Sequence, residues 1–343
     1  MKNHILLLAL CALACGQPGV HVKDRTCGGC LDANGLCLLG NTLEACGAAG
    51  AVCMACAGDQ VCSAGACVGG DGGIGFAPDA NVSSDGGYDD CSAEAKLIYV
   101  LDQDRTLLSF DPLKLATSGG AFQTVGRISC PSEPGAEPFS MAVDRSATAW
   151  IIYDSGELFT VNLRAYPLDC VKTVFVPQYG VAKFGMGFVA NQPGSHEETL
   201  YISGSELTGS LATTRFGTLS TTPPHQLMLR GILNGAPEIT GTGDAKLWAF
   251  FPNVTPPKVA QLDKTDGGVL NAFEAQALTG RPRAWAFAFW GGDFFLFLER
   301  DTDLSTQLWR MDGVSGNVTK VMSLDSRHIV GAGVSTCAPV EIN

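Results

Sequence analysis

The sequence predicts an all-β protein, a five-bladed β-propeller that is closed by its own C-terminal strand and preceded by a small disulfide-rich module. Three observations predict this architecture. Short apolar runs recur through residues 139–333 at a nearly constant interval, which is typical of propeller blades. The chain has 42 glycines and only 16% charged residues, and helical periodicity is almost absent. Eight cysteines lie between residues 27 and 67, where disulfides must replace an apolar core.

The N-terminus has the features of an export signal, which we assign to residues 1–14. An apolar run at 5–14 has the length of a signal-peptide core and is too short to span a bilayer. Cys15 follows the small and apolar residues 12–14 (ALA), so we expect cleavage before Cys15 and lipidation of its sulfur. Ala12 stands where lipoprotein signals usually have Leu, and ordinary secretion with cleavage after Ala14 is the alternative. Both interpretations export the protein.

Lipidation would make residues 15–26 a tether to a membrane. Because Gly16 rather than Asp follows the cysteine, we expect the outer membrane, and the side of the envelope on which the protein lies is left open. The net charge of −12 argues against nucleic acid or an anionic lipid surface as a partner. No later segment resembles a transmembrane helix, so membrane contact would depend on the lipid.

The cysteines divide the exported chain into domains. The eight that we expect to form the disulfide-rich module at 27–67 are Cys27, Cys30, Cys37, Cys46, Cys53, Cys56, Cys62 and Cys67. The CxxC pairs at 27–30 and 53–56 have nearly zinc-ribbon spacing, and a CxxC pair also occurs in redox proteins. The chain is predicted to be exported, and four further cysteines lie in the same segment. Both features favour disulfides over a zinc site or a redox-active pair, so we expect no metal and no cofactor. Residues 68–90, rich in Gly, Asp and Ser, are predicted to be a flexible linker.

Residues 91–343 carry the repeat that predicts the propeller. Five apolar runs begin at residues 139, 184, 239, 284 and 329, with the sequences FSMAV, FGMGF, ITGTG, AWAFA and IVGAG. Each of the first four is followed by a more aromatic run and then by a third run, as expected for successive strands of one blade. We assign the first runs to the inner strands, where Gly and Ala would allow close approach around a narrow ring.

The two ends of this domain complete the pattern. Residues 97–101 and 106–110 resemble second and third strands without a first, whereas 329–336 resembles a first strand with nothing after it. A C-terminal strand that enters the N-terminal blade resolves both gaps. This closure would bring Cys91 close to Cys337, and a disulfide between them would lock the ring. Cys130 and Cys170 follow late strands of neighbouring repeats and are the expected second pair.

Two parts of the chain resemble one group of proteins. The cysteine-rich segment, CGGCLDANGLCLLGNTLEACGAAGAVCMACAGDQVCSAGAC, is similar to segments near the N-termini of uncharacterised lipoproteins of myxobacteria, which have CC where this chain has Cys30-Leu31. The segments at 139–163, 239–251, 284–297 and 330–339 resemble the propeller-like domain of the same group. The resemblance implies an envelope lipoprotein and transfers no catalytic residue.

The sequence contains no recognisable catalytic constellation. The five predicted inner strands lack Asp and Glu, which disfavours a glycosidase with carboxylates in a central cavity. Asp144, Asp244 and Asp293 lie at the turns that follow first runs. One interpretation makes them acids or calcium ligands on one face of the ring. The simpler interpretation is that they stabilise the turns. We expect the tryptophans in the core between blades rather than in a sugar-binding platform: Trp150, Trp248, Trp285, Trp290 and Trp309.

These features predict a cell-envelope protein that presents a non-catalytic propeller as a binding or interaction module. Its partner would be an envelope protein or polysaccharide, in addition to the membrane that holds the lipid. A hydrolase that acts on an extracellular polymer and a purely structural envelope component are the alternatives. The presence or absence of clustered carboxylates in the central channel bears directly on the hydrolase alternative.

Overall fold

The computed structural model describes residues 91–342, except 116–119 and 207–211, and short segments between 27 and 68. The chain divides into two compact units, of which the first ends at Gly86 and the second begins at Gly87; each unit is described by itself. The predicted signal at 1–14, Cys15 with its tether at 15–26, and residues 69–90 of the predicted linker lie outside the described residues.

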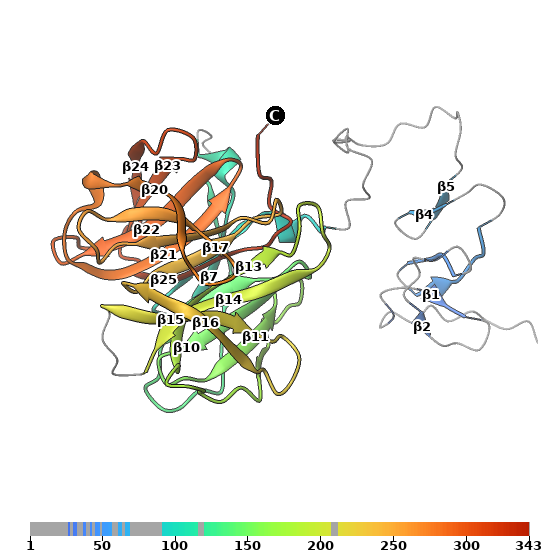
Figure 1. The fold of residues 1–343 in the computed structure, drawn as a ribbon. Coiled ribbons are helices and arrows are strands. Elements are labelled where there is room, and N and C mark those ends of the chain that lie inside the picture. Colours follow the sequence, from blue (N-terminus) through green and yellow to red (C-terminus); the bar gives the residue numbers. More distant parts are fainter. Residues whose placement is uncertain are drawn as a thin grey trace, which may run out of the picture. The chain divides into compact units, whose positions relative to one another are not determined.

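The second unit is the predicted five-bladed propeller, with five antiparallel sheets of four strands (Figure 1). Blade 1 consists of β25 (Ile329–Val334), β6 (Ile98–Asp102), β7 (Thr106–Phe110) and β8 (Phe122–Arg127). Blade 2 consists of β9 (Pro138–Val143), β10 (Thr148–Tyr153), β11 (Leu158–Asn162) and β12 (Cys170–Lys172). Blade 3 consists of β13 (Lys183–Ala190), β14 (Glu198–Ser205), β15 (Thr213–Leu219) and β16 (Leu227–Asn234).

The remaining two blades follow the same order from the inner to the outer strand. Blade 4 consists of β17 (Glu238–Gly241), β18 (Leu247–Phe251), β19 (Lys258–Leu262) and β20 (Val269–Glu274). Blade 5 consists of β21 (Pro282–Trp290), β22 (Asp293–Arg300), β23 (Gln307–Asp312) and β24 (Val318–Ser323). The repeat predicted the first three strands of each blade, and the structure adds a fourth, outer strand to every blade.

The ring closes as predicted, because the C-terminal strand β25 is the inner strand of blade 1. It pairs with β6 in antiparallel register, with Gly331 opposite Leu101 and Val334 opposite Ile98. The structure joins Cys91 to Cys337 by a disulfide, and a second disulfide joins Cys130 to Cys170. The first of these links the two ends of the propeller sequence, so hydrogen bonds and a covalent bond together hold blade 1 closed.

Small residues bring the inner strands into backbone contact. A Cβ atom on Gly187 of β13 would lie 2.6 Å from the carbonyl oxygen of Ile239 in β17. A Cβ atom on Gly333 of β25 would lie 2.8 Å from a methyl group of Val143 in β9. Both distances are shorter than a real side chain allows, so these positions require glycine. The core itself lies between the blades, where Trp150, Trp248 and Trp290 are buried.

The first unit has little regular structure and is held by disulfides. Its strands are β1 (Cys30–Leu31), β2 (Cys37–Leu38), β3 (Ala51–Val52), β4 (Val61–Ser63) and β5 (Ala66–Val68). Disulfides join Cys30 to Cys53, Cys46 to Cys62 and Cys56 to Cys67. Cys27 is also disulfide-bonded, and the side chain of Cys37 lies outside the described residues.

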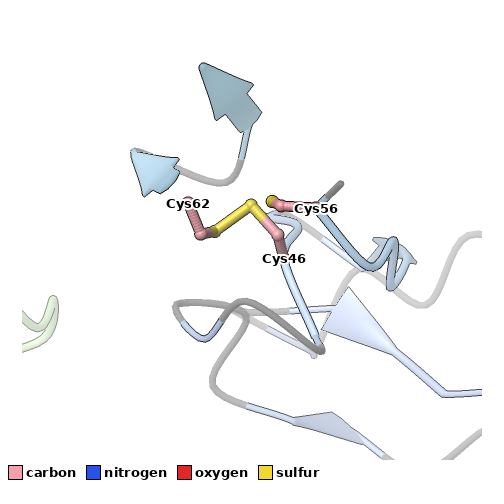
Figure 2. Close-up of side chains that lie close together, drawn as sticks. All are labelled: Cys46, Cys56 and Cys62. Carbon is pink, nitrogen blue, oxygen red and sulfur yellow. A yellow bond between two sulfur atoms is a disulfide. The ribbon is translucent and has the colours of Figure 1, made fainter. Parts of the chain in front are cut away.

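The four cysteines of the two CxxC pairs are all disulfide-bonded, and one further group of cysteines lies close together. The sulfur atoms of Cys46, Cys56 and Cys62 lie within 4.8 Å of one another. Figure 2 shows the bond between Cys46 and Cys62, with the sulfur of Cys56 beside it. Cys56 is bonded to Cys67, so the cluster is two adjacent disulfides, whereas zinc binds thiolates. Among the described residues, no helix has the length and apolarity needed to cross a membrane.

Candidate functional site

The candidate site is a cavity of about 390 Å³ at the end of the ring where the inner strands begin. We call it the axial cup. All five blades contribute to its wall. The lining side chains used below are Gln103 from blade 1, Glu137, Phe139 and Asp154 from blade 2, Lys183 from blade 3, Glu238 from blade 4, and Arg283 and Trp285 from blade 5.

Glu238 corrects the expectation that the inner strands lack acids. β17 begins one residue before the predicted apolar run and therefore includes this glutamate. The side chain is buried, with 4% of its surface exposed. The hydroxyl of Ser140 donates a hydrogen bond to Oε2 over 2.9 Å, and the amides of Met186 and Ile239 also donate to the carboxyl group. Burial nevertheless raises the pKa of Glu238 to about 8, so the group is mainly protonated at neutral pH.

Blade 2 places two exposed acids at the rim of the cup. Glu137 precedes β9, and Asp154 follows β10. The backbone amide of Glu137 donates to Oδ1 of Asp154 over 2.9 Å. The side-chain amide of Gln103 donates to Oε2 of Glu137 over 2.9 Å. These bonds fix both carboxylates on one side of the opening.

The cations of the cup come from blades 3 and 5. Lys183 is the first residue of β13, and its Nζ lies 5.1 Å from the ring centre of Phe139. Arg283 lies at a β-bulge, where the register between β21 and β22 shifts. Its guanidinium Nη1 is 3.8 Å from Oε1 of Glu299. The buried Glu299 also contacts Nδ1 of His328 at 2.6 Å, so one carboxylate orients both neighbouring side chains.

The repeat itself contains the signal that locates these residues. The position immediately before each predicted apolar run holds Pro138, Lys183, Glu238, Arg283 or His328. We call these five positions the entry ring. The prediction is based on the apolar runs. It therefore does not include the preceding residues, of which Pro138, Lys183, Glu238 and Arg283 line the cup.

Trp285 packs between the blades, as predicted, and also lines the axial cup. Like Trp309, it packs against the core between blades 4 and 5 as a partly buried side chain. Unlike the three buried tryptophans, it lines the axial cup. An indole that is anchored on one side and accessible on the other provides a flat apolar surface for a ligand.

The opposite end of the channel is filled by residues 335–339, which we call the C-terminal plug. The hydroxyl of Ser335 donates to the carbonyl of Ala95 in blade 1 over 2.6 Å. The hydroxyl of Thr336 contacts Arg145 of blade 2 and Glu198 of blade 3. Its carbonyl oxygen lies 2.5 Å from where a Cβ atom on Gly243 of blade 4 would be.

Blade 5 completes the contacts of the plug. The amide of Gly291 donates to the carbonyl of Pro339 over 2.7 Å. Since the plug touches every blade at this end, it crosses the axis of the ring. The disulfide between Cys91 and Cys337 lies within the plug and ties it to the start of the propeller.

A second acid with a raised pKa, the half-buried Glu198, lies beneath the plug. Glu198 accepts hydrogen bonds from the backbone amide of Arg145 over 2.8 Å and from the hydroxyl of Thr336 over 2.8 Å. The pKa of Glu198 is raised to about 7, mainly by desolvation and also by the nearby charge of Asp144, although the hydrogen bonds and the charge of Arg145 oppose the shift. Its partners all belong to the chain, so this acid joins blades 2 and 3 to the plug.

The three aspartates that follow the first runs have local roles. Asp144 accepts hydrogen bonds from the amides of Ser146 and Thr148. Asp244 forms an ion pair with Lys246 at 2.7 Å. Asp293 begins β22 and pairs with Arg310. The contacts that these aspartates make are thus hydrogen bonds within turns and ion pairs with nearby side chains.

A larger groove, of about 660 Å³, lies on blade 3. Its lining comes from β14, β15, β16 and residues 178–179, and consists mainly of aliphatic, hydroxyl and amide side chains. Glu198 is its only carboxylate among the described residues, and that group is already bonded to the plug. The axial cup brings together more groups that can orient a polar ligand.

No protein-family model and no curated protein matches the chain. Among solved structures, a chain of a nidogen–laminin complex has 10% identity and a TM-score of 0.45, over 72% of this chain and 99% of that one. An exo-β-1,3-galactanase from Phanerochaete chrysosporium has 12% identity and a TM-score of 0.39, over 66% of this chain and 54% of that one. TolB from Acinetobacter baumannii has 13% identity and a TM-score of 0.39, over 66% and 52%. The chain spans about half the length of the last two proteins.

Proposed function

We propose that this protein is an exported envelope protein that binds a glycan in the axial cup without cleaving it. One observation carries the proposal: the accessible indole of Trp285 lies in the same cavity as the converging polar groups of Gln103, Glu137 and Asp154. A sugar ring has apolar C–H faces and a rim of hydroxyls. An aromatic surface beside fixed hydrogen-bonding groups suits both parts.

Export is supported by the covalent framework. The disulfides of both units are typical of a compartment outside the cytosol. Anchoring at Cys15 in the outer membrane is the more specific part of the proposal and is tested separately. We expect Cys15→Ser to abolish metabolic labelling with a fatty acid and to remove sensitivity to globomycin. Unchanged processing and labelling of that variant would exclude the anchor.

Binding can be tested by applying the purified protein to immobilised envelope and extracellular glycans, followed by calorimetry. We expect Trp285→Ala to weaken binding at least about tenfold. The variant loses the packing of the sugar's C–H face on the indole and the apolar area that this packing buries. Tyr179→Ala is the matched control, since Tyr179 is an exposed aromatic residue that lines the groove on blade 3. Loss of binding in the control alone would move the site to that groove. Failure of every glycan to bind would favour a structural role.

A glycan hydrolase is the second candidate, favoured by one specific observation. The protonated Glu238 shares the cup with the exposed carboxylates of Glu137 and Asp154. A proton-donating acid near an ionised carboxylate is the pair that glycoside hydrolysis requires. Prolonged incubation with the bound glycan distinguishes the two functions. New reducing ends that disappear in Glu238→Gln would establish hydrolysis, whereas unchanged glycan together with binding supports the non-catalytic function.

A further inference from the structure

The charges of the axial cup are separated by blade. Blades 3, 4 and 5 are consecutive around the ring, and their inner strands β13, β17 and β21 contact one another in that order. They present Lys183, Glu238 and Arg283 to the cavity. The exposed acids Glu137 and Asp154 both come from blade 2. The cup therefore has a cationic side, on which a carboxyl group stands between two cations, and an anionic side.

The guanidinium group of Arg283 is positioned by its surroundings. The β-bulge at this residue redirects its side chain relative to the regular strand. Glu299 holds the group from one side at 3.8 Å. A guanidinium group has five N–H donors in a planar fork, and the distance of 3.8 Å to Glu299 is an ion-pair distance rather than a hydrogen bond. More than half of the Arg283 side chain, 59%, is exposed.

Glu238 does not oppose an anion on this side of the cup. With its pKa raised to about 8, the carboxyl group is mainly neutral at pH 7 and has a proton to donate. Ser140 and two backbone amides occupy the group from within the wall. An approaching carboxylate would favour the protonated form further, because two negative charges at short distance repel each other.

We propose that the cup selects glycans that carry carboxylate groups, with a uronate carboxylate held between Lys183 and Arg283 next to Glu238. This inference rests on the proposed glycan-binding function and specifies its ligand class. Charge-assisted hydrogen bonds from Lys183 and Arg283 supply the selectivity. Glu137 and Asp154 accept hydrogen bonds from sugar hydroxyls on the opposite side, and Trp285 packs against the ring.

The charged groups that face this site from other elements are compatible with the assignment. Glu299 is paired with Arg283 and His328 rather than directed at the ligand. Glu137 and Asp154 are held on blade 2 by their bonds to Gln103 and to the backbone. A ligand that placed its carboxylate on the blade 2 side would meet these two acids, so the charge separation also fixes the orientation of the sugar.

The test compares three forms of one oligosaccharide with the full protein: an oligogalacturonate, its methyl ester and the neutral oligogalactose. Calorimetry at pH 7 should show that the free acid binds at least about tenfold more tightly than the ester, a difference of about 1.4 kcal/mol. The affinity for the acid should fall above pH 8, because ionised Glu238 would repel the bound carboxylate. A sulfated oligosaccharide that binds as tightly as the acid would overturn selection for carboxylates.

The variants Lys183→Gln and Arg283→Gln should each weaken binding of the acid by about tenfold and leave binding of the ester unchanged. Arg281→Gln is the matched control, because Arg281 is two residues away, 85% exposed and paired with Asp301. Thermal melting establishes that each variant is folded. In Glu238→Gln the affinity for the acid should no longer fall above pH 8, since the amide does not ionise.

The possible outcomes separate this inference from the function on which it rests. Equal affinity for acid, ester and neutral sugar would overturn the inference and leave glycan binding intact. Tighter binding of the acid that persists in Lys183→Gln and Arg283→Gln would place the carboxylate elsewhere and also overturn it. If none of these sugars binds and no other glycan does, the proposed function fails as well.

Discussion

The two ends of the ring are built from the same repeat but have opposite characters. At the cup, charged residues at or next to the start of the inner strands β13, β17 and β21 line an open cavity. At the other end, the chain continues from β25 into a buried segment that contacts all five blades, with Ser335 and Thr336 0% and 4% exposed. A fivefold repeat makes both ends available in principle. The segment that follows β25 covers one end, and the other end stays open.

Each end also contains a glutamate with a raised pKa, and the two differ in their partners. Glu198 is bonded to groups of the plug and of blade 2, which gives it a role in holding the ring closed. Glu238 is bonded to the channel wall and faces the cavity. The two glutamates therefore differ in what they contact: Glu198 contacts the plug, whereas Glu238 contacts the channel wall and the cup.

Removal of the disulfide between Cys91 and Cys337 should give the largest change in the free energy of unfolding. This change should affect the plug end of the ring and not the cup. We expect Cys91→Ser combined with Cys337→Ser to lower the free energy of unfolding by about 2–5 kcal/mol, because the disulfide closes a very long loop. The residues it joins are separated by 246 positions in the sequence. Denaturant unfolding of the natural and variant proteins measures this difference.

The second disulfide provides the control for that measurement. Cys130 and Cys170 are separated by only 40 positions, so replacing both with serine should cost less in the chain-entropy model. Ligand affinity measured where the variants remain folded should be unchanged, since neither disulfide lies in the cup. Equal unfolding energies for the natural protein and the Cys91/Cys337 variant would show that hydrogen bonding alone holds the ring closed.

Closer packing at the plug should have an intermediate effect. Gly243→Ala places a methyl group against the carbonyl oxygen of Thr336, which lies 2.5 Å from the new Cβ position. Backbone must shift to accommodate it, and we expect a loss of about 1–3 kcal/mol in the free energy of unfolding. Gly126→Ala is a suitable control, because its new methyl group would meet only the end of the Leu168 side chain at 3.0 Å. A stable Gly243→Ala variant would show that the plug can move aside.

The ring could be predicted because its evidence is periodic. A strand such as β18 is buried along its whole length. It therefore needs a continuous apolar sequence, and such a sequence appears once in each blade. The outer strands carry no such signal. β20 is exposed at nearly every position, so its sequence resembles that of a loop, and only its pairing with β19 makes it a strand.

The cup could be predicted only in part, for a related physical reason. The cavity is lined by residues from all five blades. Several of these residues occupy the same position in their repeats, but they are not of the same amino-acid type. Lys183, Glu238 and Arg283 occupy equivalent positions before their apolar runs, yet they differ in charge and size. The protonation of Glu238 depends on burial in the assembled ring, which no local pattern encodes.

The smallest expected effect is a difference in how the two ends respond to pH. The pKa of each glutamate is raised in the folded protein, to about 7 for Glu198 and about 8 for Glu238. A raised carboxyl pKa means that the folded state binds more protons than the unfolded state, so stability falls as pH rises from the unfolded pKa to the folded one. Between pH 5 and 7 both groups should contribute to this fall.

Between pH 7 and 8 mainly Glu238 still loses its proton. We expect the free energy of unfolding to fall there by at most about 1.4 kcal/mol for that group. Glu238→Gln should remove this fall, whereas Glu198→Gln should leave it and should instead flatten the decline between pH 5 and 7. Denaturant midpoints at half-unit pH steps measure both windows. If Glu198→Gln flattened the upper window as well, the two ends would be coupled through the inner strands, and the open cup would sense the state of the plug.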